Sequence, residues 1–100
     1  MEATETEPLD VERIRRDFPI LSREVADGVP LVYLDNAATS QTPEPVVEAI
    51  VDYYHRYNAN VHRGIHRLSQ EASEAYEVAH DRLAEFVGAD GREEMVFTKN

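Results

Sequence analysis

The chain has 100 residues, and 20 acidic residues against 10 basic ones give it a net charge of −10 and a pI near 4.7. This acidity argues against nucleic acid and anionic membranes as partners, because phosphate binding requires a basic surface. The chain has no cysteine, which excludes a disulfide, a thiolate ligand and a thiol nucleophile among these residues. Its apolar runs fall well short of the roughly eighteen residues of a membrane span, and its first residues are acidic, unlike a signal peptide. We therefore expect a cytoplasmic protein.

The first half of the chain predicts one helix and one strand. Residues 1–9 are acidic and predict a disordered leader. Asp10 is suited to cap a short helix that runs to about Asp17, because apolar residues follow it at spacings of three and four. Residues 26–30 have the composition of a turn, and the apolar, partly β-branched residues 31–34 predict a strand.

The second half predicts two longer helices and a second short strand. Residues 42–44, Thr-Pro-Glu, supply a hydroxyl cap, a proline at the first helical position and an acid facing the helix dipole, and this helix runs to about Tyr57. Apolar residues recur every three or four positions over 69–87, and Gly88 is suited to end that helix in a left-handed conformation. Residues 95–97 predict a strand.

These elements make an α/β chain that is helix-rich with short strands. A lone strand leaves its backbone N–H and C=O groups unpaired, and two short strands seldom form a sheet that is stable by itself. The sequence therefore predicts a piece of a larger α/β protein.

The run 58–66 is the most unusual stretch, because two histidines and an arginine surround Gly64 between two predicted helices. Polar side chains at a sharp bend indicate a pocket wall or a subunit contact. His62 and His66 have the spacing of a zinc-binding pair, but Arg63 stands where such motifs carry glutamate, so we expect no metal site. A structural role as hydrogen-bonded loop histidines is the alternative.

A second polar stretch, residues 35–39 (Asp-Asn-Ala-Ala-Thr), follows the first predicted strand. It is typical of a strand end followed by a turn in which small residues pack tightly. Alternatively, the paired alanines allow a ligand to approach the backbone. Composition alone favours the turn.

Basic residues are unevenly chosen, since nine are arginine and one, Lys99, is lysine. Lys99 is thus the one residue here able to form a Schiff base, but it has no evident desolvating pocket or activating partner, and we expect no catalytic role for it. Heavy acidity with almost no lysine resembles halophilic proteins, in which salt screens self-repulsion. An ordinary acidic cytosolic protein is the alternative.

Four segments carry a family pattern in chain order. They are 11–21 with its Phe-Pro-Ile-Leu turn, 33–39 (Tyr-Leu-Asp-Asn-Ala-Ala-Thr), 60–66 (Asn-Val-His-Arg-Gly-Ile-His) and 96–98 (Val-Phe-Thr). These residues resemble the N-terminal segment of the Suf-type (group II) cysteine desulfurases, pyridoxal-phosphate (PLP) enzymes of the class V aminotransferase family. The resemblance covers residues 10–100, and the second and third segments are its most specific parts.

The resemblance implies the N-terminal portion of an aspartate-aminotransferase-like (fold type I) PLP enzyme. Residues 10–100 would form its N-terminal segment and the start of the PLP-binding large domain. The family implies a homodimer that converts L-cysteine to L-alanine and takes the sulfur as a persulfide on an enzyme cysteine. The sulfur then passes to an acceptor protein of the Suf system for iron–sulfur cluster assembly.

Carried over by position, five residues would bind substrate. Ala37 and Ala38 would line the substrate side of the pocket, and His62 would approach the substrate. Arg63 would lie near the dimer contact. Asn36 occupies a position that is often serine in relatives, so its own role stays open.

The family's Schiff-base lysine, its persulfide cysteine and its other catalytic groups belong to later parts of its sequence. We therefore expect no catalytic or cofactor-binding residue here, and a chain that is inactive by itself. Two alternatives stay open. One is another class V reaction, such as that of selenocysteine lyase, a kynureninase-like enzyme or an aminotransferase. The other is a freestanding acidic module that binds a partner through its helical stripes.

Overall fold

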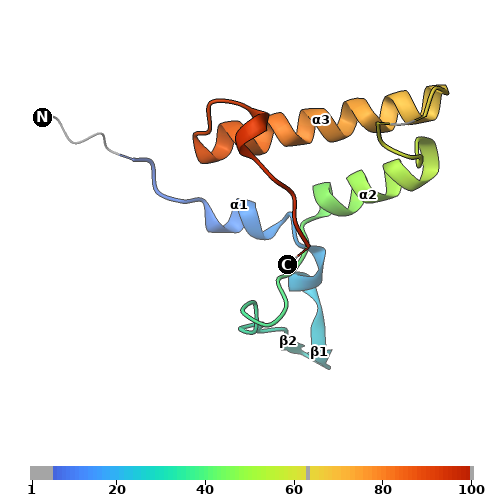
Figure 1. The fold of residues 1–100 in the computed structure, drawn as a ribbon. Helices are drawn as coiled ribbons and strands as arrows, with labels where there is room; N and C mark the ends of the chain where they lie inside the picture. The colour runs from blue at the N-terminus through green and yellow to red at the C-terminus, as the bar shows by residue number, and fades with distance from the viewer. Residues whose placement is uncertain (1–5, 63, 100) are drawn as a thin grey trace, which may run out of the picture. The chain divides into compact units, whose positions relative to one another are not determined.

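The computed structural model describes residues 6–62 and 64–99. The chain divides into two units, Met1–Ile50 and Val51–Asn100, and each is described by itself. Figure 1 shows the order of the helices and strands along the chain. Within the predicted leader, residues 6–9 are exposed and have no regular structure, and residues 1–5 lie outside the described residues.

The first helix, α1 (Val11–Arg15), has the predicted cap. The Asp10 carboxylate accepts a hydrogen bond from the Arg13 N–H at 3.0 Å, which satisfies one of the unpaired donors at the helix start. The helix ends at Arg15, two residues before the predicted end, and the 3₁₀ helix η1 (Pro19–Ser22) follows it.

A small hairpin occupies the predicted turn. Its strands are β1 (Glu24–Ala26) and β2 (Val29–Pro30), which pair antiparallel with Glu24 opposite Pro30. Gly28 sits at the tip with φ +71°, a conformation that glycine adopts without steric cost. The turn was predicted correctly, but the strands on either side of it were not.

The strand predicted at residues 31–34 is wrong. Leu31 donates one backbone hydrogen bond to the Arg23 carbonyl at 2.9 Å, and the chain then leaves the ladder. Val32 is 75% exposed and Leu34 is 89% exposed. A strand needs a neighbour to accept and donate its hydrogen bonds, and the sheet in the described residues consists of β1 and β2 alone.

Helix α2 (Glu44–Arg56) begins one residue later than predicted. The Pro43 carbonyl accepts from the Val46 and Val47 N–H groups at 3.0 and 3.3 Å, so Pro43 rather than Thr42 occupies the cap position. The predicted apolar stripe is present but exposed. Its members, 39–66% exposed, are Val46, Val47, Ile50, Val51 and Tyr54.

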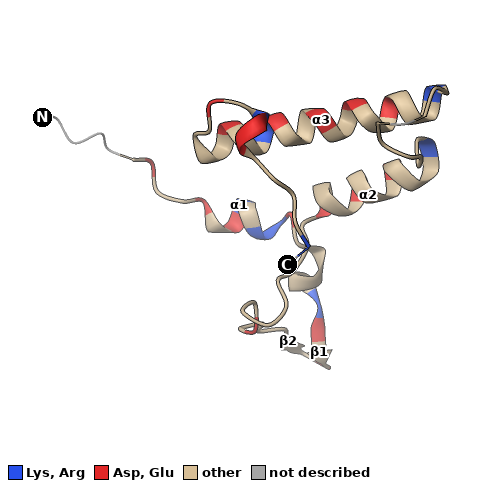
Figure 2. Ribbon diagram, in the orientation of Figure 1, with Lys and Arg blue, Asp and Glu red and all other residues tan. Residues whose placement is uncertain are grey.

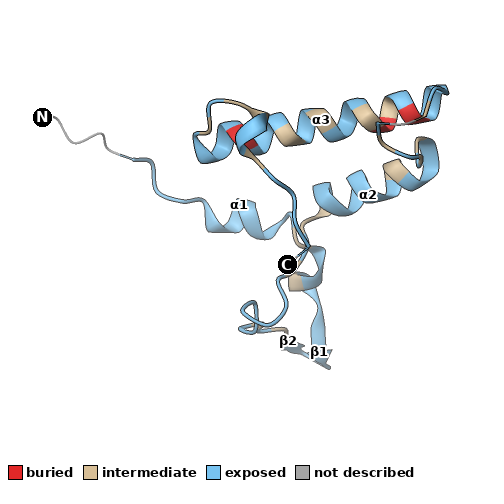
Figure 3. Ribbon diagram, in the orientation of Figure 1, coloured by how far each residue is buried: buried red, intermediate tan, exposed pale blue. Residues whose placement is uncertain are grey.

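Helix α3 (Arg67–Val87) begins two residues before the predicted start and ends as predicted. Gly88 has φ +76°, and the Ala89 N–H donates to the Ala84 carbonyl at 2.9 Å, which closes a Schellman motif. Acidic residues recur along this helix (Figure 2). The buried residues of the described chain, Ser69, Ala72 and Ala84, all lie on α3 (Figure 3).

The strand predicted at residues 95–97 is also wrong. The 3₁₀ helix η2 (Arg92–Glu94) packs on α3, and Met95 continues from it with extended backbone, φ −107° and ψ 126°. No strand lies beside this segment among the described residues, so the extended backbone forms no ladder. In the same part of the chain, no helix is both long and apolar enough to cross a membrane.

Candidate functional site

The Asn36 loop is a closed turn. The Asp35 carbonyl accepts hydrogen bonds from the Ala38 and Thr39 N–H groups, both at 3.1 Å. The Tyr33 hydroxyl reaches across the loop to the Thr39 carbonyl at 2.5 Å and lies 3.2 Å from that of Asp35. These contacts explain how a turn of small residues holds one shape, as the sequence predicted for residues 35–39.

Asn36 stabilises the same loop with its side chain. Its amide oxygen accepts from the Gln41 N–H at 3.2 Å, and its backbone carbonyl accepts from the Ser40 hydroxyl at 3.3 Å. Ala37 and Ala38 are exposed, and each presents no more than a methyl group beside the backbone. The arrangement therefore leaves the loop backbone accessible to a small molecule.

His62 lies in the second unit and is held by one face of α3. Its φ of +73° is unusual for a residue with a side chain. Its N–H donates to the Ser73 hydroxyl at 2.8 Å, and its ring meets that of Tyr76 edge to face, with centroids 5.3 Å apart. Its Nδ1 lies 3.9 Å from Oε1 of Glu77, while the side chain stays 53% exposed. The ring is thus contacted on one side and open to solvent on the other.

Glu77 has a second partner in Arg92 of η2. Arg92 Nη1 lies 3.4 Å from Glu77 Oε2, and the same guanidinium makes two hydrogen bonds of 2.7 Å to the Asp81 carboxylate. The hydrogen bonds to Asp81 are the main reason that the pKa of Arg92 is raised above its ordinary value. Arginine is cationic in proteins, so Glu77 faces a positive charge.

The approach to α3 depends on Gly64 and Ser69. The Ser69 side chain is fully buried, and its hydroxyl donates to the Asn60 carbonyl at 2.5 Å. A Cβ atom at Gly64 would overlap the Ser69 side chain. His66 caps the helix, since its Nδ1 accepts from the Ser69 N–H at 3.2 Å. His66 therefore has the structural role that was the alternative to a place in a pocket wall or subunit contact.

The predicted site residues therefore divide between the two units. Asn36, Ala37 and Ala38 share one loop of the first unit, His62 lies in the second, and Arg63 lies outside the described residues. Lys99 is exposed.

Ser73, Tyr76 and Glu77 were not predicted as part of the site. Apolar recurrence along α3 explains Tyr76 as packing and gives no reason to select the other two. A signal was present, because spacings of three and four place all three residues on one helix face. The spacing alone does not identify the site, because the sequence does not show that the chain before α3 folds back over that face.

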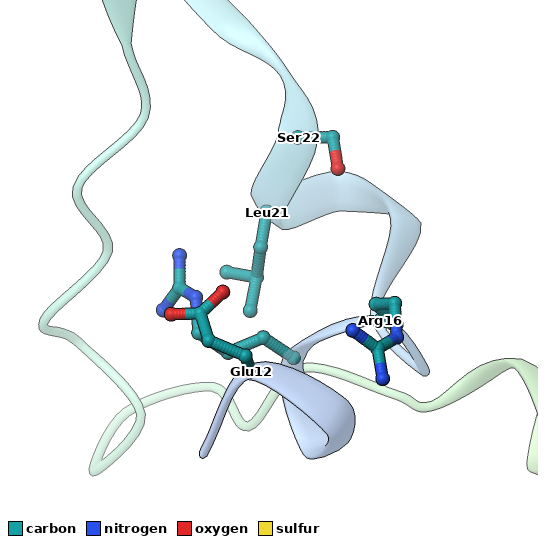
Figure 4. Close-up of a pocket in the computed structure, with 5 residues that line it drawn as sticks. Glu12, Arg16, Leu21 and Ser22 are labelled. Carbon is teal, nitrogen blue, oxygen red and sulfur yellow. The ribbon is translucent and has the colours of Figure 1, made fainter. Parts of the chain in front are cut away.

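Two shallow pockets lie away from these residues. In the first unit, a pocket of about 250 Å³ is lined by Glu12, Arg15, Arg16, Leu21 and Ser22 (Figure 4). In the second unit, a pocket of about 360 Å³ is lined by Arg56, Tyr57, Glu71, Glu74, Ala75 and Val78. Neither pocket contains a predicted site residue.

Comparison with known proteins gives a consistent result. The family model for Aminotransferase class-V matches residues 32–100. The whole chain is 76% identical to a probable cysteine desulfurase of Halobacterium salinarum, of which it covers 24%. It is also 66% identical to a cysteine desulfurase of Haloferax volcanii, covering 100% of this chain and 26% of that protein. The apo structure of a cysteine desulfurase from Thermococcus onnurineus NA1 matches with a TM-score of 0.73 and 50% identity, over 90% of this chain and 20% of that one.

The chain thus spans about a quarter of the length of the curated relatives it matches, 24% and 26%. The structural likeness confirms the predicted fold class, because a helix-rich chain with two short strands aligns with part of a solved enzyme of this kind. The described elements are the α/β N-terminal portion of a fold type I enzyme.

Proposed function

Because the chain belongs to the aminotransferase class-V family, we propose that it is the N-terminal part of a PLP-dependent cysteine desulfurase. The observation that carries this proposal is the 76% identity to a probable cysteine desulfurase along the entire chain. The proposed whole enzyme is a cytoplasmic homodimer of the Suf type. It takes sulfur from L-cysteine, releases L-alanine and delivers the sulfur to an acceptor protein for iron–sulfur cluster assembly.

The exposed apolar surface supports a role as part of a larger enzyme. The α2 stripe defined above is open to solvent, and Phe86 and Val96 are 87% and 77% exposed. An apolar stripe along a helix and large exposed apolar side chains are normally covered by protein. We propose that later parts of the polypeptide cover it.

The class V aminotransferase family depends on PLP, and we propose that the residues that bind this cofactor lie in other parts of the enzyme. A Schiff base requires a lysine in a desolvated environment, and the chain's single lysine, Lys99, is exposed. When bound to such enzymes, PLP withdraws electrons from the substrate. We therefore assign its contacts, and the catalytic cysteine, to other parts of the enzyme.

The proposed task of this chain is substrate binding. Asn36 keeps its loop closed, so that Ala37 and Ala38 present accessible backbone rather than large side chains. His62 offers an imidazole whose ring nitrogens can donate and accept hydrogen bonds. By the resemblance, Arg63 would lie near the dimer contact. In the whole enzyme, each of these residues would contribute to binding the amino acid.

The test is turnover by the product of the complete gene. We expect L-alanine and sulfide in equal amounts from L-cysteine with a reductant present, and His62→Gln should lower kcat/KM by about tenfold or more. Residues 1–100 alone should be inactive and should not bind PLP. Turnover of L-selenocysteine alone, or of an amino acid with a keto acid alone, would replace desulfuration with another class V reaction. A full-length product without PLP would favour a binding module.

A further inference from the structure

We infer that Glu77 is a positioning residue for His62, and that Arg92 fixes Glu77 in turn. The inference rests on the proposed function, in which His62 contacts the substrate. The orientation of the His62 imidazole then depends on three charged groups, which are Asp81 and Glu77 on α3 and Arg92 on η2.

The backbone of His62 requires such support. A residue with a Cβ at φ +73° lies in the left-handed region, where the Cβ crowds the backbone. Residues held in this way cluster at functional sites, where the surroundings impose the conformation. Here the 2.8 Å hydrogen bond from the His62 N–H to the Ser73 hydroxyl fixes the backbone to α3.

With the backbone fixed, two side chains of the same helix face determine where the ring lies. The Tyr76 ring meets it at an interplanar angle of 87°, and Glu77 Oε1 faces its Nδ1 at 3.9 Å. The Glu77 carboxylate attracts the Nδ1 side of the ring electrostatically, at a distance longer than a hydrogen bond. The two contacts together orient the ring.

The Glu77 carboxylate is itself oriented. Its second oxygen lies 3.4 Å from Arg92 Nη1, and Arg92 is held by two 2.7 Å hydrogen bonds to Asp81, one turn further along α3. A guanidinium held at Nε and Nη2 by one carboxylate has a defined direction, and its third nitrogen, Nη1, is left to face Glu77. The position of η2 is therefore coupled to the position of the His62 ring. Glu77 is 47% exposed, so we expect an effect of modest size.

The experiment compares Glu77→Gln, Glu77→Asp and Glu85→Gln in the full-length enzyme with PLP. Glu85 is an exposed acid on the same helix and serves as the matched control. We expect Glu77→Gln to raise the KM for L-cysteine about twofold to fivefold with little change in kcat. Glu77→Asp should recover part of this loss, and Glu85→Gln should have none.

A double-mutant cycle separates positioning from general stability. If Glu77 acts through His62, adding Glu77→Gln to His62→Gln should change KM no further. Carbethoxylation of the apoenzyme, followed by mass spectrometry, provides a readout besides activity. Glu77→Gln should raise the rate of carbethoxylation at His62 and leave the rate of carbethoxylation at His55, on α2, unchanged.

The outcomes distinguish the inference from the proposed function. A wild-type enzyme without L-cysteine turnover would overturn the proposed function. An active wild type in which Glu77→Gln leaves KM and the His62 carbethoxylation rate unchanged would overturn the inference alone. Equal losses from Glu77→Gln in both His62 backgrounds would also overturn it.

Discussion

Gly64 lies just before α3, and the absence of a Cβ atom lets its backbone pass close to the Ser69 side chain. Space explains the glycine, because a Cβ atom would overlap the fully buried Ser69 side chain, which is bonded to the Asn60 carbonyl. The loop that carries His62 therefore depends on the absence of a side chain two residues further on.

Gly64→Ala should destabilise the full-length protein by about 1–3 kcal/mol, the usual cost of overpacking. Thermal melting followed by circular dichroism measures it. Gly91→Ala is the matched control, because the added Cβ would meet only the flexible Glu93 carboxylate, which can move aside. The double change Gly64→Ala with Ser69→Gly should recover part of the loss. Equal melting temperatures for Gly64→Ala and Gly91→Ala would contradict this steric account.

At the level of the element, the two ends of α3 are fixed by different means. At its start, the His66 ring accepts from the Ser69 N–H in place of the usual serine, threonine or aspartate. At its end, Gly88 turns left-handed and directs the chain into η2. Helix α3 carries Ser73, Tyr76, Glu77 and Asp81, so fixing its two ends also supports the contacts to His62 and Arg92.

His66→Ala should lower the free energy of unfolding by about 1 kcal/mol, since it leaves a helix-start donor without its acceptor. His66→Asp restores an acceptor at the same position and should be close to wild type. Urea denaturation of the full-length protein provides the comparison. Indistinguishable His66→Ala and His66→Asp proteins would argue against the cap.

Gly88→Ala should cost about 1–2 kcal/mol, because φ +76° places the new Cβ near the following carbonyl. Gly88→Asn tolerates the left-handed region better and should lose less. We expect the urea midpoint to fall from wild type to Gly88→Asn and to be lowest for Gly88→Ala. An alanine variant as stable as wild type would mean that the helix can end in another way.

At the level of the whole molecule, charge and exposed apolar surface are the dominant features. The chain has a net charge of −10, while only Ala72 and Ala84 are buried hydrophobic residues in the described part. Self-repulsion opposes compaction at low ionic strength, and salt weakens repulsion over distances beyond the Debye length.

We expect the melting temperature of the full-length enzyme to rise by roughly 5 °C or more between about 0.1 M and about 1 M KCl. Potassium chloride at both concentrations, with PLP saturating, isolates screening from cofactor binding. A flat response would show that the acidity has no role in stability and would favour an ordinary acidic cytosolic protein.

The sequence predicted the helices well and the strands poorly, for one physical reason. Caps such as Asp10 and Gly88 act within a few residues, so local patterns reveal them. A strand at 31–34 or 95–97 depends on a neighbour that local patterns do not contain, and the apolar residues there indicated strand propensity only. The same limit applies to the site. The motifs selected Asn36 and His62, whereas the partners of His62 on α3 emerged only from how the chain folds back.

The contacts that hold the second unit join residues close in sequence. Asn60 and Ser69 are 9 residues apart, His62 and Ser73 are 11 apart, and His80 and Met95 are 15 apart. Short separations form quickly, and chains begin to fold from the N-terminal side during synthesis. Helix α3 and the loop before it can therefore fold on the ribosome while the α2 stripe is still exposed. During that interval the exposed apolar side chains leave the nascent chain open to aggregation.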